Sequence, residues 1–141
     1  MKVNRSVTVP VPADRAFRAF TKKMGRWWPA SFTFIEKGHR DTVLEPNVGG
    51  RLYQTGADGN QHVIGEVRVY EPPTRVLFTW GQPDWEGTTE VEVRFTEESG
   101  ATRVDLEHRG FESVGPKGED SFKEYDGGWV EVLRHYEKFA A

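Results

Sequence analysis

The sequence DSFKEYDGGWVEVLRHYEKFAA, residues 120–141, carries the clearest helix signal in the chain. Its apolar side chains recur at spacings of three and four residues, which predicts an α-helix with one apolar stripe. The stripe consists of Trp129, Val132, Leu133, Tyr136 and Phe139, and the residues that face water include Glu131, Arg134 and Lys138. Because an apolar stripe must be covered, the rest of the chain has to supply a matching surface.

That surface is predicted to be a sheet, since residues 40–111 consist of short alternating segments separated by turn formers. The last two segments each have one apolar and one charged face, which is typical of an antiparallel sheet packed on one side only. In the fourth segment, alternation places Val63, Val67 and Val69 on one face with Gly65. The predicted strands are 3–11, 39–45, 51–55, 61–70, 75–80, 88–96 and 102–109.

Two short helices are predicted between the first and second strands. Apolar residues continue there at helical spacing as Phe17, Phe20, Met24, Trp27 and Trp28. Gly25 is expected to split the segment in two, and Pro29 to end it. Residues 31–37 show no clear period and are assigned as a loop or irregular edge. The chain, residues 1–141, is therefore predicted to be one α+β domain.

The composition excludes several classes of function. A net charge of −3 and a pI near 5.8 argue against a nucleic-acid partner. With no cysteine there is neither a disulfide, a thiolate nucleophile nor a cysteine zinc site. No segment reads as a membrane span or a signal peptide, so a cytoplasmic location is expected. The chain has five Trp, nine Phe and four Tyr, which is more than a core beneath such short strands needs, so some of them are expected to line a cavity.

Six words of the sequence, in this order and spacing, resemble the activator of Hsp90 ATPase homologue family within the START/Bet v 1-like (SRPBCC) helix-grip superfamily. They are VPADRAFRAFT (11–21), RWW (26–28), EPNVGGRL (45–52), GEVRVYEPPTRVLFTW (65–80), ATRVDLEHRGF (101–111) and GGWVEVLRHYEKF (127–139). The resemblance implies a curved antiparallel sheet that grips the last helix, with a hydrophobic pocket between them. It implies no common reaction, because the superfamily includes lipid carriers, hormone receptors and cyclases, and a fold does not fix a function.

The predicted pocket wall draws on the two short helices, the sheet and the last helix. An apolar wall with a few polar groups is the usual composition of a small-molecule site. The alternative is that the same side chains only pack together as core. The predicted ligand-binding residues are Trp27, Trp28, Leu52, Val67, Phe78, Trp80, Val93, Leu106, His108, Trp129, Leu133 and Tyr136.

His108 is the polar residue of greatest interest, because alternation places it on the inward face of its strand. It could donate to a ligand oxygen or transfer a proton, or it could simply bond to a backbone carbonyl near the end of the sheet. The other histidines, His39, His62 and His135, are isolated, so no metal site is predicted. No catalytic residue and no cofactor are assigned.

Three functions are compatible with the sequence. The first is non-catalytic binding of a small hydrophobic or amphipathic molecule between the sheet and the last helix. The second is an enzyme of the cyclase or hydrolase kind that uses the same cavity, with His108 or Tyr136 transferring the proton. The third is a module that acts on a chaperone through its outer surface. The sequence leaves open a chaperone partner and a homodimer.

The pair Gly127-Gly128 needs an explanation, because each glycine inside a helix costs about 0.8–1.0 kcal/mol relative to alanine. One explanation is a helix boundary, with Asp126 as the capping residue. The other is a helix that already runs from about Glu119, in which the missing side chains allow close approach of the sheet or a ligand. The second explanation is favoured for Gly128, since it precedes the predicted pocket residue Trp129.

Overall fold

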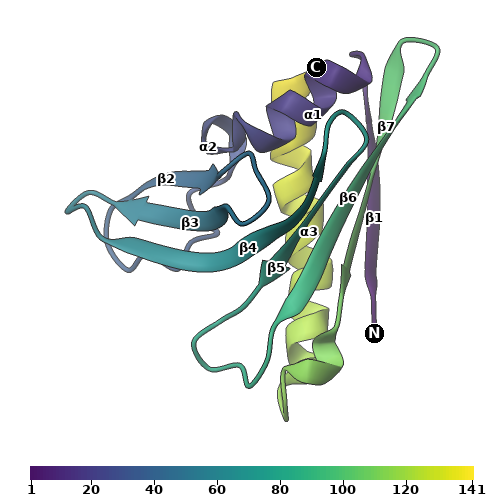
Figure 1. Cartoon of the computed structure of the whole chain (residues 1–141). Helices are drawn as coiled ribbons and strands as arrows, with labels where there is room; N and C mark the ends of the chain where they lie inside the picture. Colours follow the sequence, from purple (N-terminus) through teal and green to yellow (C-terminus); the bar gives the residue numbers. More distant parts are fainter.

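A computed structural model describes residues 1–141 and shows a seven-stranded antiparallel sheet curved around one long helix (Figure 1). The strand order is β1-β7-β6-β5-β4-β3-β2, so every strand after β1 lies beside its neighbour in sequence. The strands are β1 Val3–Val9, β2 His39–Leu44, β3 Arg51–Gly56, β4 Gln61–Glu71, β5 Arg75–Trp80, β6 Thr89–Glu98 and β7 Ala101–Arg109. This confirms the predicted α+β helix-grip fold, although the first strand ends at Val9 rather than at residue 11.

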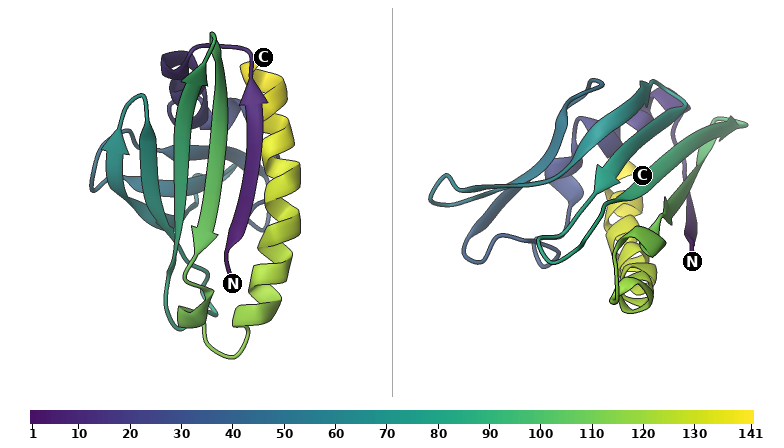
Figure 2. Two further views of the ribbon diagram at one scale, coloured as in Figure 1. Left: turned by 90° about the vertical axis from the view of Figure 1, so that its right-hand side faces the viewer. Right: turned by 60° about the horizontal axis from the view of Figure 1, so that its bottom comes forward.

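The long helix, α3, spans Gly118–Ala140 and follows a short 3-10 turn at Phe111–Ser113. It runs beside β1 along the inner side of the sheet (Figure 2). Trp129, Val132, Leu133 and Tyr136 are buried, as the predicted stripe requires, and Phe139 is half-buried. Because α3 begins ten residues before Gly128, both glycines lie inside the helix and the boundary explanation is wrong. The helices include none that is long and apolar enough to cross a membrane.

The two predicted short helices are α1, Ala13–Thr21, and α2, Met24–Trp27. The break between them falls at Lys22 and Lys23 rather than at Gly25, which lies within α2. Trp28 follows with an extended backbone, φ −61° and ψ 123°, as expected for a residue before proline. The hydroxyl of Tyr136 donates to the carbonyl oxygen of Ala16 at 2.8 Å, which ties α3 to α1.

The face predicted for β4 is wrong at Val63, whose side chain is 52% exposed although Val67 is fully buried. The register between β3 and β4 shifts at Leu52 and Tyr53, where two residues of β4 stand opposite one of β3. This β-bulge reverses the alternation, so that Ile64 rather than Val63 points inward. Gly65 sits at the bulge because a Cβ there would lie 1.7 Å from the carbonyl oxygen of Thr79. The bulge also bends the strand, which contributes to the curvature of the sheet.

Candidate functional site

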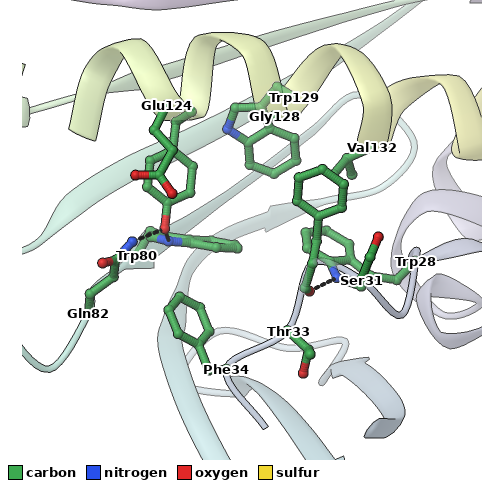
Figure 3. A pocket seen from close by; sticks show the side chains of 12 residues that line it. Trp28, Ser31, Thr33, Phe34, Trp80, Gln82, Glu124, Gly128, Trp129 and Val132 are labelled. Atoms are coloured by element: carbon green, nitrogen blue, oxygen red, sulfur yellow. Dashed lines mark hydrogen bonds between the residues drawn. The ribbon is translucent and has the colours of Figure 1, made fainter. Parts of the chain in front are cut away.

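A cleft of about 210 Å³ opens between the first half of α3, the loop that follows α2 and the end of β5 (Figure 3). Half of its twelve lining residues are aromatic. The helix contributes Glu124, Tyr125, Gly128, Trp129 and Val132, the loop contributes Trp28, Ser31, Phe32, Thr33 and Phe34, and the segment at the end of β5 contributes Trp80 and Gln82. No charged side chain other than Glu124 lines it.

Three tryptophans form the inner part of the cleft. The ring centroids of Trp28, Trp80 and Trp129 lie 5.8 to 6.1 Å apart, and Trp129 meets both of the others edge to face. Such arrangements are the preferred geometry for aromatic pairs. Because all three rings are at least 92% buried, each indole N–H needs a partner inside the protein. The partners found for these N–H groups fix the orientation of the rings.

His108 supplies the partner for Trp129. The indole Nε1–H of Trp129 donates to His108 Nδ1 at 3.0 Å, and His108 Nε2 lies 2.7 Å from Thr89 Oγ1. The Thr89 hydroxyl in turn donates to the carbonyl oxygen of Trp80 at 3.1 Å. This chain of bonds requires a neutral imidazole with its proton on Nε2. Burial favours the same state, because it lowers the pKa of His108 to about 3.

Tyr125 supplies the partner for Trp80. The indole Nε1–H of Trp80 donates to the Tyr125 hydroxyl at 2.8 Å, and the Gln82 side-chain amide also donates to this oxygen. With two bonds accepted, the phenol proton remains available to a third group. Were the Gln82 amide turned over, its NH₂ would become the available donor instead. In either arrangement the pair offers one hydrogen-bond donor at this side of the cleft.

The outer wall of the cleft, residues 28–34, has no regular secondary structure and depends on a buried side chain behind it. Gln54 on β3 is fully buried. Its Oε1 accepts from the Phe34 backbone N–H at 2.8 Å, and its Nε2 donates to the Phe32 carbonyl oxygen at 3.1 Å. The Trp28 indole N–H donates to the same carbonyl at 2.7 Å. One glutamine and one tryptophan therefore hold the loop against the sheet.

Of the twelve residues predicted to bind a ligand, Trp28, Trp80 and Trp129 line the cleft. The structure brings the other nine together behind these rings, at most 4% exposed and not on the cleft wall. They are Trp27, Leu52, Val67, Phe78, Val93, Leu106, His108, Leu133 and Tyr136. A ligand contact by any of these nine stays a prediction, since it would require the core to open.

The cleft contains residues that the sequence did not single out. Tyr125 lies one helical turn before Trp129, so extending the helical pattern backwards from Trp129 could have found it. Phe32 and Phe34 lie in the loop without a period, where no sequence signal marks the direction of a side chain. Gln82 was missed for the same reason, because it lies in a polar loop.

The residues around the cleft do not resemble a metal centre. No group of three or more His, Asp or Glu side chains in the chain is placed to hold a metal ion. The polar groups that face the cleft are suited to hydrogen bonding with an organic molecule.

Comparison with known proteins agrees with the family resemblance of the six sequence segments. The sequence model of the family described as Activator of Hsp90 ATPase homolog 1-like protein matches residues 10–140. The chain belongs to this family. None of the curated proteins compared with the chain matches it.

Solved structures of similar fold include two whose sequences are at least 28% identical to this chain. An anthrahydroquino-γ-pyrone synthase, Txn09, is 32% identical, with a TM-score of 0.66 over 97% of this chain and 95% of that one. CalC, a self-sacrificing resistance protein from Micromonospora echinospora, is 28% identical, with a TM-score of 0.75 over 99% and 93%. A protein from Mesorhizobium loti is 20% identical, with a TM-score of 0.73 over 98% and 95%, and supports the fold alone. Members of this fold thus differ in what they do.

Proposed function

We propose that the chain binds a small, flat, largely aromatic molecule in the cleft between α3, β5 and the loop 28–34. The observation that carries the proposal is the wall itself, in which Trp28, Trp80, Trp129, Phe32, Phe34 and Tyr125 surround one opening. Aromatic faces favour flat partners, because stacked and edge-to-face contacts add to the gain from burying apolar surface. The volume of about 210 Å³ is below the roughly 300–1,000 Å³ of sites for drug-sized ligands, so the bound part has few rings.

A carbonyl oxygen is the polar group that best fits this cleft. The Tyr125 hydroxyl accepts from Trp80 and Gln82 and has a proton to give. A carbonyl on the ligand would accept this proton without needing a donor of its own. A ligand that filled the cleft without an acceptor would leave the Tyr125 hydroxyl proton unpaired, at a cost of about 1–3 kcal/mol. The hydrogen bond therefore also selects among ligands of similar shape.

Tryptophan fluorescence provides the test. Flavone, which is flat and carries one carbonyl, should change the emission with saturation, whereas a steroid and a medium-chain fatty acid should give smaller changes at the same concentration. Three of the five tryptophans line the cleft, so a bound ring system lies next to the reporters. A flat response to all three classes overturns the proposal.

Two matched variants show whether the signal comes from the cleft. Gly128 faces the cleft, and Gly127, its neighbour on α3, is exposed with no atom within 4 Å of a Cβ placed there. Gly128→Leu should fill the cleft and abolish the flavone signal. Gly127→Leu, the same change one residue away, should retain it. Equal binding by both variants would place the ligand elsewhere.

A second function, ring closure on the bound molecule, is favoured by the 32% identity to a γ-pyrone synthase. A γ-pyrone forms when a hydroxyl oxygen attacks a carbonyl carbon of a 1,3-diketone and one water leaves. In the cleft, Tyr125 can polarise the carbonyl by hydrogen bonding. The geometry favours Tyr125 over His108 and Tyr136, because both of those are fully buried and hydrogen-bonded to other groups.

This second function can be assayed with 1-(2-hydroxyphenyl)-3-phenylpropane-1,3-dione, which loses water to give flavone. Catalysis predicts that flavone absorbance appears faster than in buffer and that Tyr125→Phe slows its appearance. A rate equal to that in buffer, with flavone binding intact, leaves binding alone as the function.

The chaperone hypothesis calls for a large exposed apolar patch. The strongly exposed large apolar side chains are Met1, Phe32, Val48, Val63 and Val130, which lie on five different segments. Nothing in this distribution favours the hypothesis, and it stays a prediction, as does a homodimer.

A further inference from the structure

The charge of the cleft is unusual for a site that would accept fatty acids. Twelve residues line it, and the one that is charged is an acid, Glu124, with no Lys, Arg or His among the others. Three histidines contact the wall from behind. His108 accepts from Trp129, His39 Nδ1 lies 2.8 Å from Thr33 Oγ1, and His62 stacks on Phe34 with ring centroids 4.8 Å apart. Burial lowers the pKa of His62, which favours its neutral form. The wall of the cleft itself therefore offers an anion no positively charged side chain.

Glu124 itself has no partner. It is exposed on α3 and forms no ion pair, whereas the adjacent Lys123 pairs with Glu119 at 3.6 Å. Its carboxylate lies on the side of the cleft where Trp80 and Gln82 meet (Figure 3). Burial raises the pKa of the Tyr125 phenol, and the charges of Glu124 and Asp84 raise it further. Asp84 is paired with Lys117 at 3.5 Å, so Glu124 is the unpaired negative charge at this end of the cleft.

The chain contains many basic side chains, yet none of them pairs with the Glu124 carboxylate. Seven basic residues lie between Arg15 and Arg40, with Glu36 the single acid among them. None of the seven takes part in an ion pair, and none lines the cleft. Several of them surround a separate hollow between α2 and β2. These basic side chains therefore lie outside the cleft wall.

We propose that the ligand of this cleft carries a positive charge, in the form of a protonated or alkylated amine on an aromatic body. The inference rests on the proposed binding function. Aromatic faces attract organic cations through their quadrupoles, and tryptophan does so most strongly. The carboxylate of Glu124 adds a second attraction at the mouth. An alkylated amine loses less hydration on entry than a free ammonium ion, so it gains most from such a site.

Three probes of matched size test the inference. They are naphthalen-1-ylmethylamine, a cation at pH 7, 1-naphthalenemethanol, which is neutral, and 1-naphthoate, an anion. Calorimetric titration should give the amine about fivefold to thirtyfold higher affinity than the alcohol, the range that a desolvated cation–π contact supports, and the anion the weakest binding. The preference should fall as salt is added, because a partly exposed charge is screened.

The variants Glu124→Gln and Glu137→Gln separate a local from a global charge effect. Glu137 is exposed on the same helix, forms no ion pair and does not line the cleft. Both variants change the net charge equally, yet Glu124→Gln alone should lower the ratio of amine to alcohol affinity. An equal ratio in both variants, or an alcohol that binds as tightly as the amine, overturns the charge inference and leaves the proposed binding function standing. Binding of none of the three probes, together with no flavone binding, overturns both.

Discussion

Two aromatic clusters lie on the inner side of the sheet, and only one of them leaves a cleft. In the first, Phe20, Trp27 and Tyr136 meet with ring centroids 5.2 Å apart. In the second, Trp28, Trp80 and Trp129 meet at the slightly larger separations of 5.8 to 6.1 Å. Both clusters consist of three aromatic side chains in contact, and the chain passes from one cluster to the other between Trp27 and Trp28.

The clusters differ in what covers them. Over the first lies α1, a regular helix whose buried face includes Phe17 and Phe20. Over the second lies the loop 28–34, which is held by side-chain hydrogen bonds and cannot present a continuous apolar face. Whether an aromatic cluster becomes core or pocket thus depends on the covering element. The predictions below test this comparison.

The largest effect is expected in the first cluster. Phe20 is fully buried, so Phe20→Ala should lower the free energy of unfolding by about 3–5 kcal/mol, the usual cost of truncating a buried aromatic side chain. Because Phe20 does not line the cleft, the folded variant should bind flavone with unchanged affinity. Urea unfolding and fluorescence titration measure the two quantities. A weakened affinity would show that the clusters are coupled.

A smaller loss is expected for Trp129→Ala in the second cluster, about 3 kcal/mol, at the lower end of the range for such changes. Although Trp129 is only 2% exposed, part of its ring borders the cleft, so slightly fewer contacts are lost than for a ring packed on all sides. The variant also leaves the buried His108 Nδ1 without its hydrogen-bond donor. Because an unpaired buried acceptor is itself destabilising, the loss of stability stays substantial. Flavone binding should be lost together with the ring. Normal binding in this variant would assign Trp129 to the core alone.

The pH dependence of stability should reveal the support behind the cleft. His108 has a pKa of about 3 in the folded chain, against about 6.5 when unfolded. Below pH 6.5 the unfolded chain therefore binds a proton that the folded chain excludes, so stability falls as pH falls. The loss between pH 6.5 and pH 5 should be about 1.5–2 kcal/mol.

Urea unfolding at several pH values measures this loss, with His108→Gln as the comparison. The variant should be less stable at pH 7 and should show a flatter profile, because glutamine does not titrate. Parallel profiles for the two proteins would contradict a buried, neutral His108.

The sequence predicts the fold better than it predicts the cleft, and particular residues show why. Periodicity identified α3 and the seven strands, because burial of one face imposes the same period along a whole element. It misplaced Val63, since the bulge in β4 adds one residue without any mark in the alternation. It could not orient Phe32 and Phe34, which owe their positions to Gln54 on a distant strand. The positions of these two cleft residues thus depend on irregular backbone and long-range hydrogen bonds, which leave no periodic pattern in the sequence.

The smallest effect, and the sharpest contrast, is expected at the two neighbouring glycines of α3. Gly127→Ala should stabilise the chain by about 0.4–1 kcal/mol, because alanine restricts the unfolded chain and its methyl group meets no atom within 4 Å. Gly128→Ala should stabilise it less. Its Cβ would lie 3.4 Å from Phe32 Cε1, at the near limit of ordinary van der Waals contact, so part of the gain is offset.

Ligand binding should separate the two glycines further. The methyl group of Gly128→Ala occupies part of the cleft and should weaken flavone binding, whereas Gly127→Ala should not change it. Thermal or urea unfolding and fluorescence titration, run side by side on both variants, provide the comparison. If Gly128→Ala gained as much stability as Gly127→Ala and bound flavone equally well, close approach would not explain the glycine at 128. The pair would then reflect helix flexibility rather than room for a ligand.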